Sequence, residues 1–101
     1  MHQRVRDLKV KVPIFVFREQ KTFVVYCPIL DLSSCGKTLH EAQERFARAV
    51  NLFIEELEEM GTLEQVLTDL GWHKQEHPRK EWIPPEVLKH SQLDIRLPSY
   101  A

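Results

Sequence analysis

The transition from sheet to helix is encoded by residues 26–38, which read Tyr26-Cys27-Pro28-Ile29-Leu30-Asp31-Leu32-Ser33-Ser34-Cys35-Gly36-Lys37-Thr38. Pro28 separates two apolar runs, and proline is typical of a turn because its φ angle is fixed. Gly36 ends the second run, and Thr38 precedes a long amphipathic pattern. The segment therefore predicts a turn, a short strand over residues 32–35 and the start of a helix.

The helix has start and stop signals at both ends. Thr38 and Glu41 have the spacing of a capping box, in which the hydroxyl and the carboxylate each accept a free backbone N–H. Gly61 suits the left-handed position just beyond a helix. At 100° per residue, the apolar side chains between these signals fall on one arc. They are Leu39, Ala42, Phe46, Ala49, Val50, Phe53, Ile54, Leu57 and Met60.

Two strands are predicted before the junction. Apolar and polar residues alternate from residue 8 to residue 16, which indicates a strand, and Pro13 favours an edge position because it donates no hydrogen bond. Residues 18–21 predict a polar turn and residues 23–27 a second strand, so that the two form a hairpin. The fold class is therefore α+β, with a mainly antiparallel sheet of three or four strands packed on one long helix.

A second, shorter helix is predicted after the first, because Thr62 and Gln65 repeat the capping-box spacing and Gly71 follows as a stop signal. We expect residues 1–71 to form the core and residues 72–101 to be an extension without a separate domain. A helical turn is expected over residues 86–89. Residues 93–97 alternate as a strand does, and this strand could pair with the edge of the first strand or with another subunit.

Two tryptophans, Trp72 and Trp82, bracket the polar part of this extension. They are expected to anchor it to the core or to an interface, with a ligand platform as the less favoured interpretation.

The charge of the 101-residue chain is unevenly spread. The net charge is −1, but residues 1–37 carry +4, residues 38–70 carry −6 and residues 71–101 carry +1. A strongly basic nucleic-acid-binding protein is not indicated. The first residues lack the apolar core of a signal peptide, and no apolar run approaches the ~18 residues that span a bilayer, so a cytoplasmic location and no membrane association are expected.

Catalytic and metal sites are not predicted. Cys27 and Cys35 are spaced C-x7-C, without the closely paired ligands typical of zinc, and are expected to be small buried free thiols. His73 and His77 lie four apart but in a polar stretch before a proline. A metal-dependent nuclease would need several converging carboxylates, and the first strand offers Asp7 alone. We therefore expect no enzyme activity, no metal and no cofactor.

Partner binding is the more productive hypothesis, and two groups of residues are candidates. In the junction, the polar residues suit either a turn that bonds its own backbone or a loop that faces a partner. On the helix, carboxylates near the C-terminus oppose the macrodipole, so they serve either solubility or recognition of a basic partner. The candidate partner-binding residues are Tyr26, Asp31, Ser33, Ser34, Leu52, Glu55 and Glu59.

A third interpretation is nucleic-acid binding through a sheet face, because Lys9 and Lys11 would share a face of the first strand with Phe15 and Phe17.

The sequence resembles the HicB-like antitoxin family over residues 8–60. The resemblance is carried by two strands and the segment that follows them. Residues 61–64 and 70–72 are also similar to a branch of the family without an obvious DNA-binding C-terminal module. The matching residues are Tyr26-Cys27-Pro28, Ser34-Cys35-Gly36-Lys37-Thr38-Leu39, Glu41-Ala42, Phe46, Ala49 and Leu52-Phe53.

This resemblance implies a compact β-β-β-α-β domain of degenerate ribonuclease-H-like type that assembles as a dimer or tetramer. It also implies a non-catalytic antitoxin that binds and neutralises a small basic toxin that cleaves mRNA. Members commonly add a DNA-binding module, but four prolines in the last 31 residues leave no room for two consecutive helices, so operator binding is not expected. The alternative is an orphan member that serves as a homo-oligomeric assembly domain without a toxin.

Overall fold

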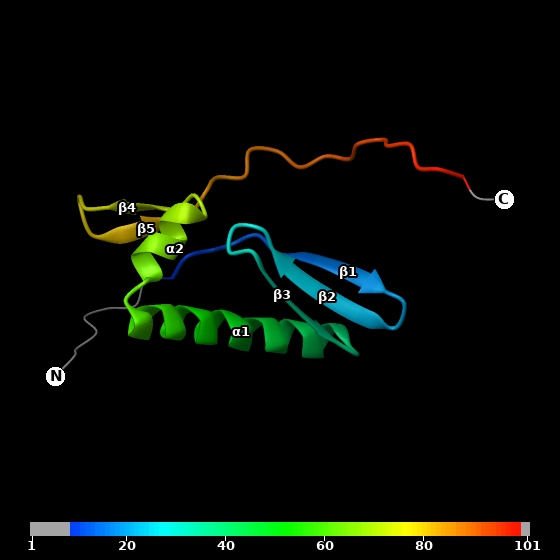
Figure 1. Cartoon of the computed structure of the whole chain (residues 1–101), viewed down its shortest axis with the longest axis horizontal. Coiled ribbons are helices and arrows are strands. Elements are labelled where there is room, and N and C mark those ends of the chain that lie inside the picture. Colours follow the sequence, from blue (N-terminus) through cyan, green and yellow to red (C-terminus); the bar gives the residue numbers. More distant parts are fainter. Residues whose placement is uncertain (1–8, 100–101) are drawn as a thin grey trace.

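A computed structural model describes residues 9–99 and shows an α+β fold, which confirms the predicted class (Figure 1). A three-stranded antiparallel sheet is followed by a long helix, a short helix and a two-stranded hairpin. The elements are β1 (Phe15–Glu19), β2 (Thr22–Cys27), β3 (Leu32–Gly36), α1 (Leu39–Met60), α2 (Leu63–Asp69), β4 (His73–Gln75) and β5 (Glu81–Ile83).

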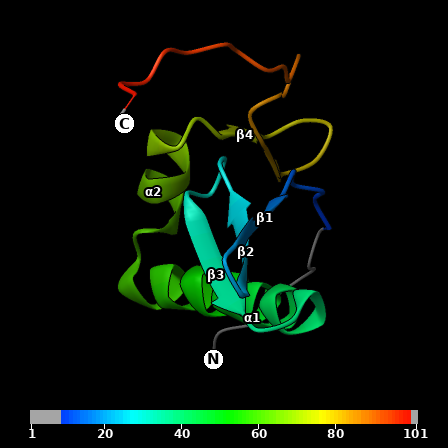
Figure 2. The same cartoon turned by 90° about the vertical axis from the view of Figure 1, so that its right-hand side faces the viewer.

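The sheet has one face covered by α1 and one face turned away from it, as Figure 2 shows. Val25 and Cys27 of β2 point toward α1 and are fully buried. Because side chains alternate across a strand, Tyr26 lies on the opposite face, where the register places it between Phe15 of β1 and Ser33 of β3. We call this side the open face.

The core lies where the sheet, the first half of α1 and α2 meet. Ala42 and Phe46 supply the part of α1 that is buried, whereas Met60, at the end of the same apolar arc, is 70% exposed. The C-terminal end of α1 therefore extends past the edge of the sheet against which its first half packs. The buried apolar residues are Val25, Cys27, Ile29, Leu30, Ala42, Phe46, Leu67 and Trp72.

The first turn of α1 lies against β3 at Gly36. A Cβ atom placed on Gly36 would lie 2.7 Å from the backbone nitrogen of Ala42 and 3.0 Å from the carbonyl carbon of Glu41. Such distances are too short for any side chain. The glycine at the end of the sheet is thus required by close approach of two backbones.

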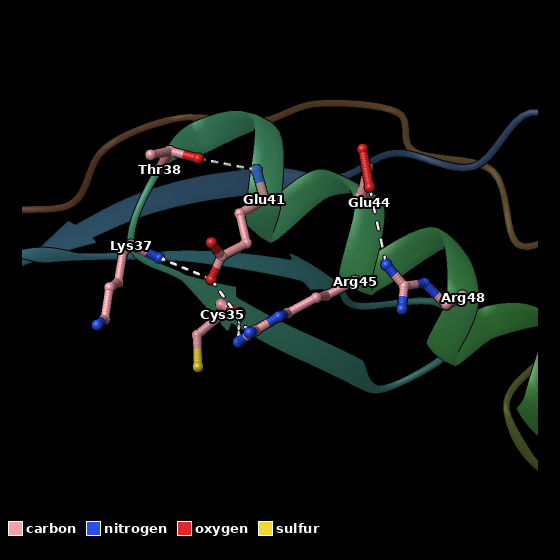
Figure 3. Close-up of polar contacts among 7 residues, drawn as sticks. All are labelled: Cys35, Lys37, Thr38, Glu41, Glu44, Arg45 and Arg48. Atoms are coloured by element: carbon pink, nitrogen blue, oxygen red, sulfur yellow. Dashed lines mark hydrogen bonds and ion pairs between the residues drawn. The ribbon is translucent and has the colours of Figure 1, made fainter.

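Both predicted caps of α1 are present. The Glu41 N–H donates to the Thr38 hydroxyl at 3.0 Å, and the Glu41 carboxylate accepts from the Lys37 N–H at 3.3 Å (Figure 3). At the other end Gly61 is left-handed, with φ 71°. Its N–H donates to the Glu58 carbonyl and the next N–H to the Leu57 carbonyl, which is the Schellman arrangement.

The second predicted capping box is wrong. Among the described residues, the Thr62 side chain makes no capping hydrogen bond, and its buried hydroxyl has no hydrogen-bond partner. The Gln65 amide instead donates to Asp69 at 2.9 Å. The physical reason is that only Gly61 and Thr62 separate the two helices, so that the Thr62 N–H completes the end of α1. Its backbone, at φ −112° and ψ 4°, lacks the extended conformation of a capping residue.

Trp72 anchors the extension, as predicted. The chain leaves α2 through left-handed Gly71, at φ 96°, and the buried Trp72 side chain then packs into the core. Its indole N–H donates to the Ile29 carbonyl at 2.8 Å. This bond joins α2 to the turn between β2 and β3.

The first strand begins and ends later than predicted. Residues 9–14 form no strand, and Leu8 lies outside the described residues. Pro13 cannot donate to a ladder, so pairing starts at Phe15. Arg18 and Glu19 belong to β1, where they pair with Phe23 and Thr22, and the reversal needs only Gln20, which is left-handed at φ 56°, and Lys21. The Arg18 guanidinium also stacks 5.4 Å from the Phe23 ring centroid.

The C-terminal expectations also need correction. The polar stretch after Trp72 contains the hairpin of β4 and β5. The helical turn expected over residues 86–89 does not form, and residues 93–97 are extended without a strand partner in the described part of the chain.

We predict that Gly36→Ala destabilises the fold by about 1–3 kcal/mol, because the added methyl group meets backbone atoms that cannot move independently. Urea unfolding at one fixed protein concentration measures the change. Gly61→Asn is the matched control: no atom of residues 9–99 lies within 4 Å of a Cβ there, and asparagine tolerates the left-handed conformation, so it should cost less than about 1 kcal/mol. Equal losses for both variants would contradict the close approach at Gly36.

Candidate functional site

The outward side of α1 is electrostatically balanced over its first half. Arg45 lies 3.2 Å from the Glu41 carboxylate, and Arg48 lies 3.7 Å from that of Glu44 (Figure 3). His40 approaches the other oxygen of Glu44 at 2.7 Å. Each acid here has a basic neighbour one turn away, which is a favourable helical spacing.

The second half of α1 is different. Leu52 is 56% exposed, and Glu55, Glu56 and Glu59 are exposed beside and beyond it. We call these four residues the acidic stripe, because steps of 100° place them on one side of the helix. None of its three carboxylates has an ion pair in the part of the chain that the structure describes, and the last turn contains no basic residue.

The acidic stripe opposes helix stability in two ways. Glu55 and Glu59 are like charges four residues apart, which is unfavourable by about 0.2–0.5 kcal/mol. Carboxylates in the last turn also oppose the macrodipole, typically by about 0.3–1 kcal/mol each. The stripe is thus a concentrated negative surface with an apolar side chain at one end, and α1 itself gains nothing from it.

The junction residues form a second and separate surface. The Tyr26 hydroxyl donates to the Asp31 carboxylate at 3.2 Å, and Ser33 pairs with Tyr26 on the open face. Ser34 is not part of this group, because its register partner is Val25 and it faces α1. Asp31 is left-handed, at φ 52°, which agrees with a structural role in the turn. The predicted site residues are therefore divided between the two sides of the sheet.

The environment of Tyr26 disfavours its ionised form. Desolvation in the sheet, followed by the hydrogen bond to Asp31 and the negative charge of that carboxylate, raises the pKa of Tyr26 above its ordinary value of 10.0. Tyr26 is therefore a neutral hydrogen-bond donor at physiological pH, and this group offers no acid–base chemistry there.

The two thiols differ from each other. Cys27 is buried and free, as predicted, but the prediction that Cys35 is buried is wrong. Cys35 pairs with Val24 in the register and so lies on the open face of an edge strand. Among residues 9–99, no group of three or more His, Cys, Asp or Glu side chains is close enough to hold a metal ion.

The premise for nucleic-acid binding is also corrected. Phe15 and Phe17 do share the open face, but Lys9 and Lys11 precede the strand and have no place in the sheet. In a separate respect, none of the helices in the described part of the chain is long and apolar enough to cross a membrane.

Two features escaped the sequence analysis. One is a depression of about 330 Å³ between the end of α1, α2 and the β4–β5 hairpin, lined by Leu57, Leu63 and Trp82 and bordered by the Lys74–Glu64 pair at 3.5 Å. In the sequence, Trp82 was the residue that could have indicated this depression. The other is the difference between Glu41 and Glu44, which have basic neighbours one turn away, and the carboxylates of the acidic stripe, which the four-residue spacing of Glu41 and Arg45 could have indicated.

Comparison of the chain with models of protein families, with characterised proteins and with solved structures finds no match. The family resemblance of residues 8–60 therefore stays a prediction.

We predict that Asp31→Asn lowers the pKa of Tyr26 part of the way toward 10.0, because it removes the negative charge but leaves the desolvation. Because the pKa of Tyr26 is raised in the folded state, the neutral phenol contributes fully to the stability of the fold below pH 10.0. This contribution is lost as the pH rises through the pKa that Tyr26 has in the folded state. Ultraviolet titration of phenolate in a Tyr100→Phe background measures Tyr26 alone. Glu76→Gln is the control, and an unchanged midpoint in Asp31→Asn would refute the contact.

Proposed function

We propose that the protein is a non-catalytic, antitoxin-type binding module of the cytoplasm that neutralises a small basic RNA-cleaving protein by covering its surface. The acidic stripe of α1 is the observation that carries this proposal. Two further points support it: the resemblance of residues 8–60 to HicB-like antitoxins, and the β-β-β-α order that this resemblance leads one to expect. Operator DNA is not part of the proposed function.

The stripe supports a partner of defined chemistry. Its three exposed carboxylates would pair with lysine or arginine side chains, and Leu52 would contact an apolar residue among them. Opposite charges on two surfaces accelerate encounter and select against wrong partners. Because exposed charges are screened over about 10 Å at 0.1 M salt, association through the stripe should slow as the salt concentration rises.

The proposal is tested by co-expression with the product of an adjacent reading frame that encodes a short basic protein. A stable complex that no longer cleaves RNA is the expected result. If the chain purifies only with itself, and a basic RNA-cleaving neighbour retains its activity when mixed with it, the antitoxin proposal fails and an assembly role takes its place.

We predict that Glu55→Lys with Glu59→Lys has opposite effects on the free protein and on the complex. The free protein should gain about 0.3–1 kcal/mol per site, because lysine suits the C-terminal end of a helix. Toxin binding should weaken by at least tenfold and lose much of its salt dependence. Thermal unfolding and titration calorimetry measure the two effects.

The control is Glu86→Lys, which is exposed and lies outside α1. It should leave both quantities unchanged. Tight binding by the doubly substituted chain would show that the stripe does not contact the toxin.

A further inference from the structure

The outer edge of β1 is open. β1 lies at one end of the strand order and has no partner on its outer side among residues 9–99. Phe15, Val16 and Phe17 are 41%, 44% and 50% exposed. An apolar edge with unpaired backbone groups is a template for another strand. The opposite edge differs, because β3 is mostly polar and its Cys35 carbonyl already accepts from Arg45 at 3.3 Å.

The same chain carries a segment that is exposed throughout the part of the chain that the structure describes. Residues 86–99, which we call the C-terminal arm, leave the body in an extended conformation (Figure 1). Leu93, Ile95 and Leu97 are 85%, 69% and 77% exposed, and they alternate with Asp94 and Arg96. The radius of gyration is 17.2 Å, against about 13 Å for a compact chain of this length. Three exposed apolar side chains at strand period indicate a strand without its sheet.

We propose that residues 93–97 of one copy of this chain add to the outer edge of β1 in a second copy, and that reciprocal exchange of the two arms forms a two-fold symmetric dimer. Each sheet then has four strands. This dimer does not rest on the proposed toxin binding, because the acidic stripe on α1 takes no part in it.

Side-chain chemistry selects an antiparallel register. With Ile95 opposite Phe17, Leu97 lies opposite Phe15 on the open face, and Asp94 lies opposite Arg18 on the other. Opposite charges directly across a ladder are favourable, and like charges are not. The parallel arrangement with Ile95 beside Phe17 would instead bring Arg96 to the level of Arg18.

The ends of this ladder agree with the same register. Pro98 comes opposite Ile14, and Pro13 comes opposite Ser99, so both prolines fall where pairing stops. At the other end Leu93 meets Glu19, the last residue of β1 before the hairpin turn. The ladder is therefore limited to five residues by features that both strands already have.

The direction of the arm indicates exchange between two copies. In Figure 1, β1 and the arm of the same chain run in the same direction, so that a simple approach of the two would be parallel. A two-fold axis perpendicular to the strands reverses the partner's arm and makes it antiparallel to β1. The same operation places the first arm on the partner's β1, which closes the assembly.

Disulfide trapping tests the exchange directly. Two full-length chains are prepared in a Cys35→Ser background, because Phe17, Val24 and Cys35 lie in one row of the sheet. One carries Phe17→Cys and the other Ile95→Cys. When they are mixed and oxidised, a disulfide-linked heterodimer is expected. Leu88→Cys, which is equally on the arm but outside the ladder, replaces Ile95→Cys as the control and should not crosslink.

Three outcomes would overturn the proposal. If the mixture gives no heterodimer while a chain with both cysteines closes an internal disulfide, the arm pairs within its own chain. If Phe17→Cys alone crosslinks to itself, the dimer forms between two β1 strands. A monomeric wild-type chain in light scattering at micromolar concentration would equally overturn it.

Charge exchange tests the register. Asp94→Arg should raise the dimer dissociation constant by about tenfold over its two symmetric copies, and adding Arg18→Asp should restore much of the loss. Ile95→Asp should give a monomer that keeps the far-ultraviolet signal of its helices and loses only the strand signal of the exchanged arms, because residues 86–99 contain no helix. Dimers that persist in Ile95→Asp, or a charge exchange without any rescue, would contradict the register.

Discussion

The contact between Gly36 and the first turn of α1 determines which face of the sheet the helix covers and which surfaces stay exposed. Backbone meets backbone there, with no room for a Cβ atom, so α1 is fixed to one face of the sheet from its first residue. A single helix cannot cover both faces. In the part of the chain that the structure describes, no further layer covers the open face or pairs with the outer edge of β1. The second half of α1 extends beyond the sheet with its acidic stripe exposed.

Capping residues predicted a helix end correctly where they belonged to one helix only. Thr38, Glu41 and Gly61 predicted both ends of α1, because capping depends on residues only three to six positions apart. The same reasoning failed at Thr62, which has to end one helix and begin another. It failed again at residues 86–89, since a proline pair favours a helical start but cannot supply the tertiary contacts that stabilise a short helix.

The candidate site shows a similar limit. The sequence identified the carboxylates of α1 but did not separate those with basic neighbours from those without, although Glu41 and Arg45 stand at a spacing that indicates a pair. It grouped Ser34 with Asp31 and Ser33 because they are adjacent in the chain. The register places Ser34 on the other side of the sheet, and strand alternation decides that once the partner strand is known.

Two surfaces therefore have different proposed roles: the β1 edge for a second copy of the chain, and the acidic stripe for a basic toxin. Hydrogen exchange of the chain with and without the basic protein from the adjacent reading frame tests this division most directly. We predict slower amide exchange in the last two turns of α1 on complex formation, with no change in β1, which the arm already protects. Protection confined to β1 or to the turn between β2 and β3, with α1 unaffected, would contradict it.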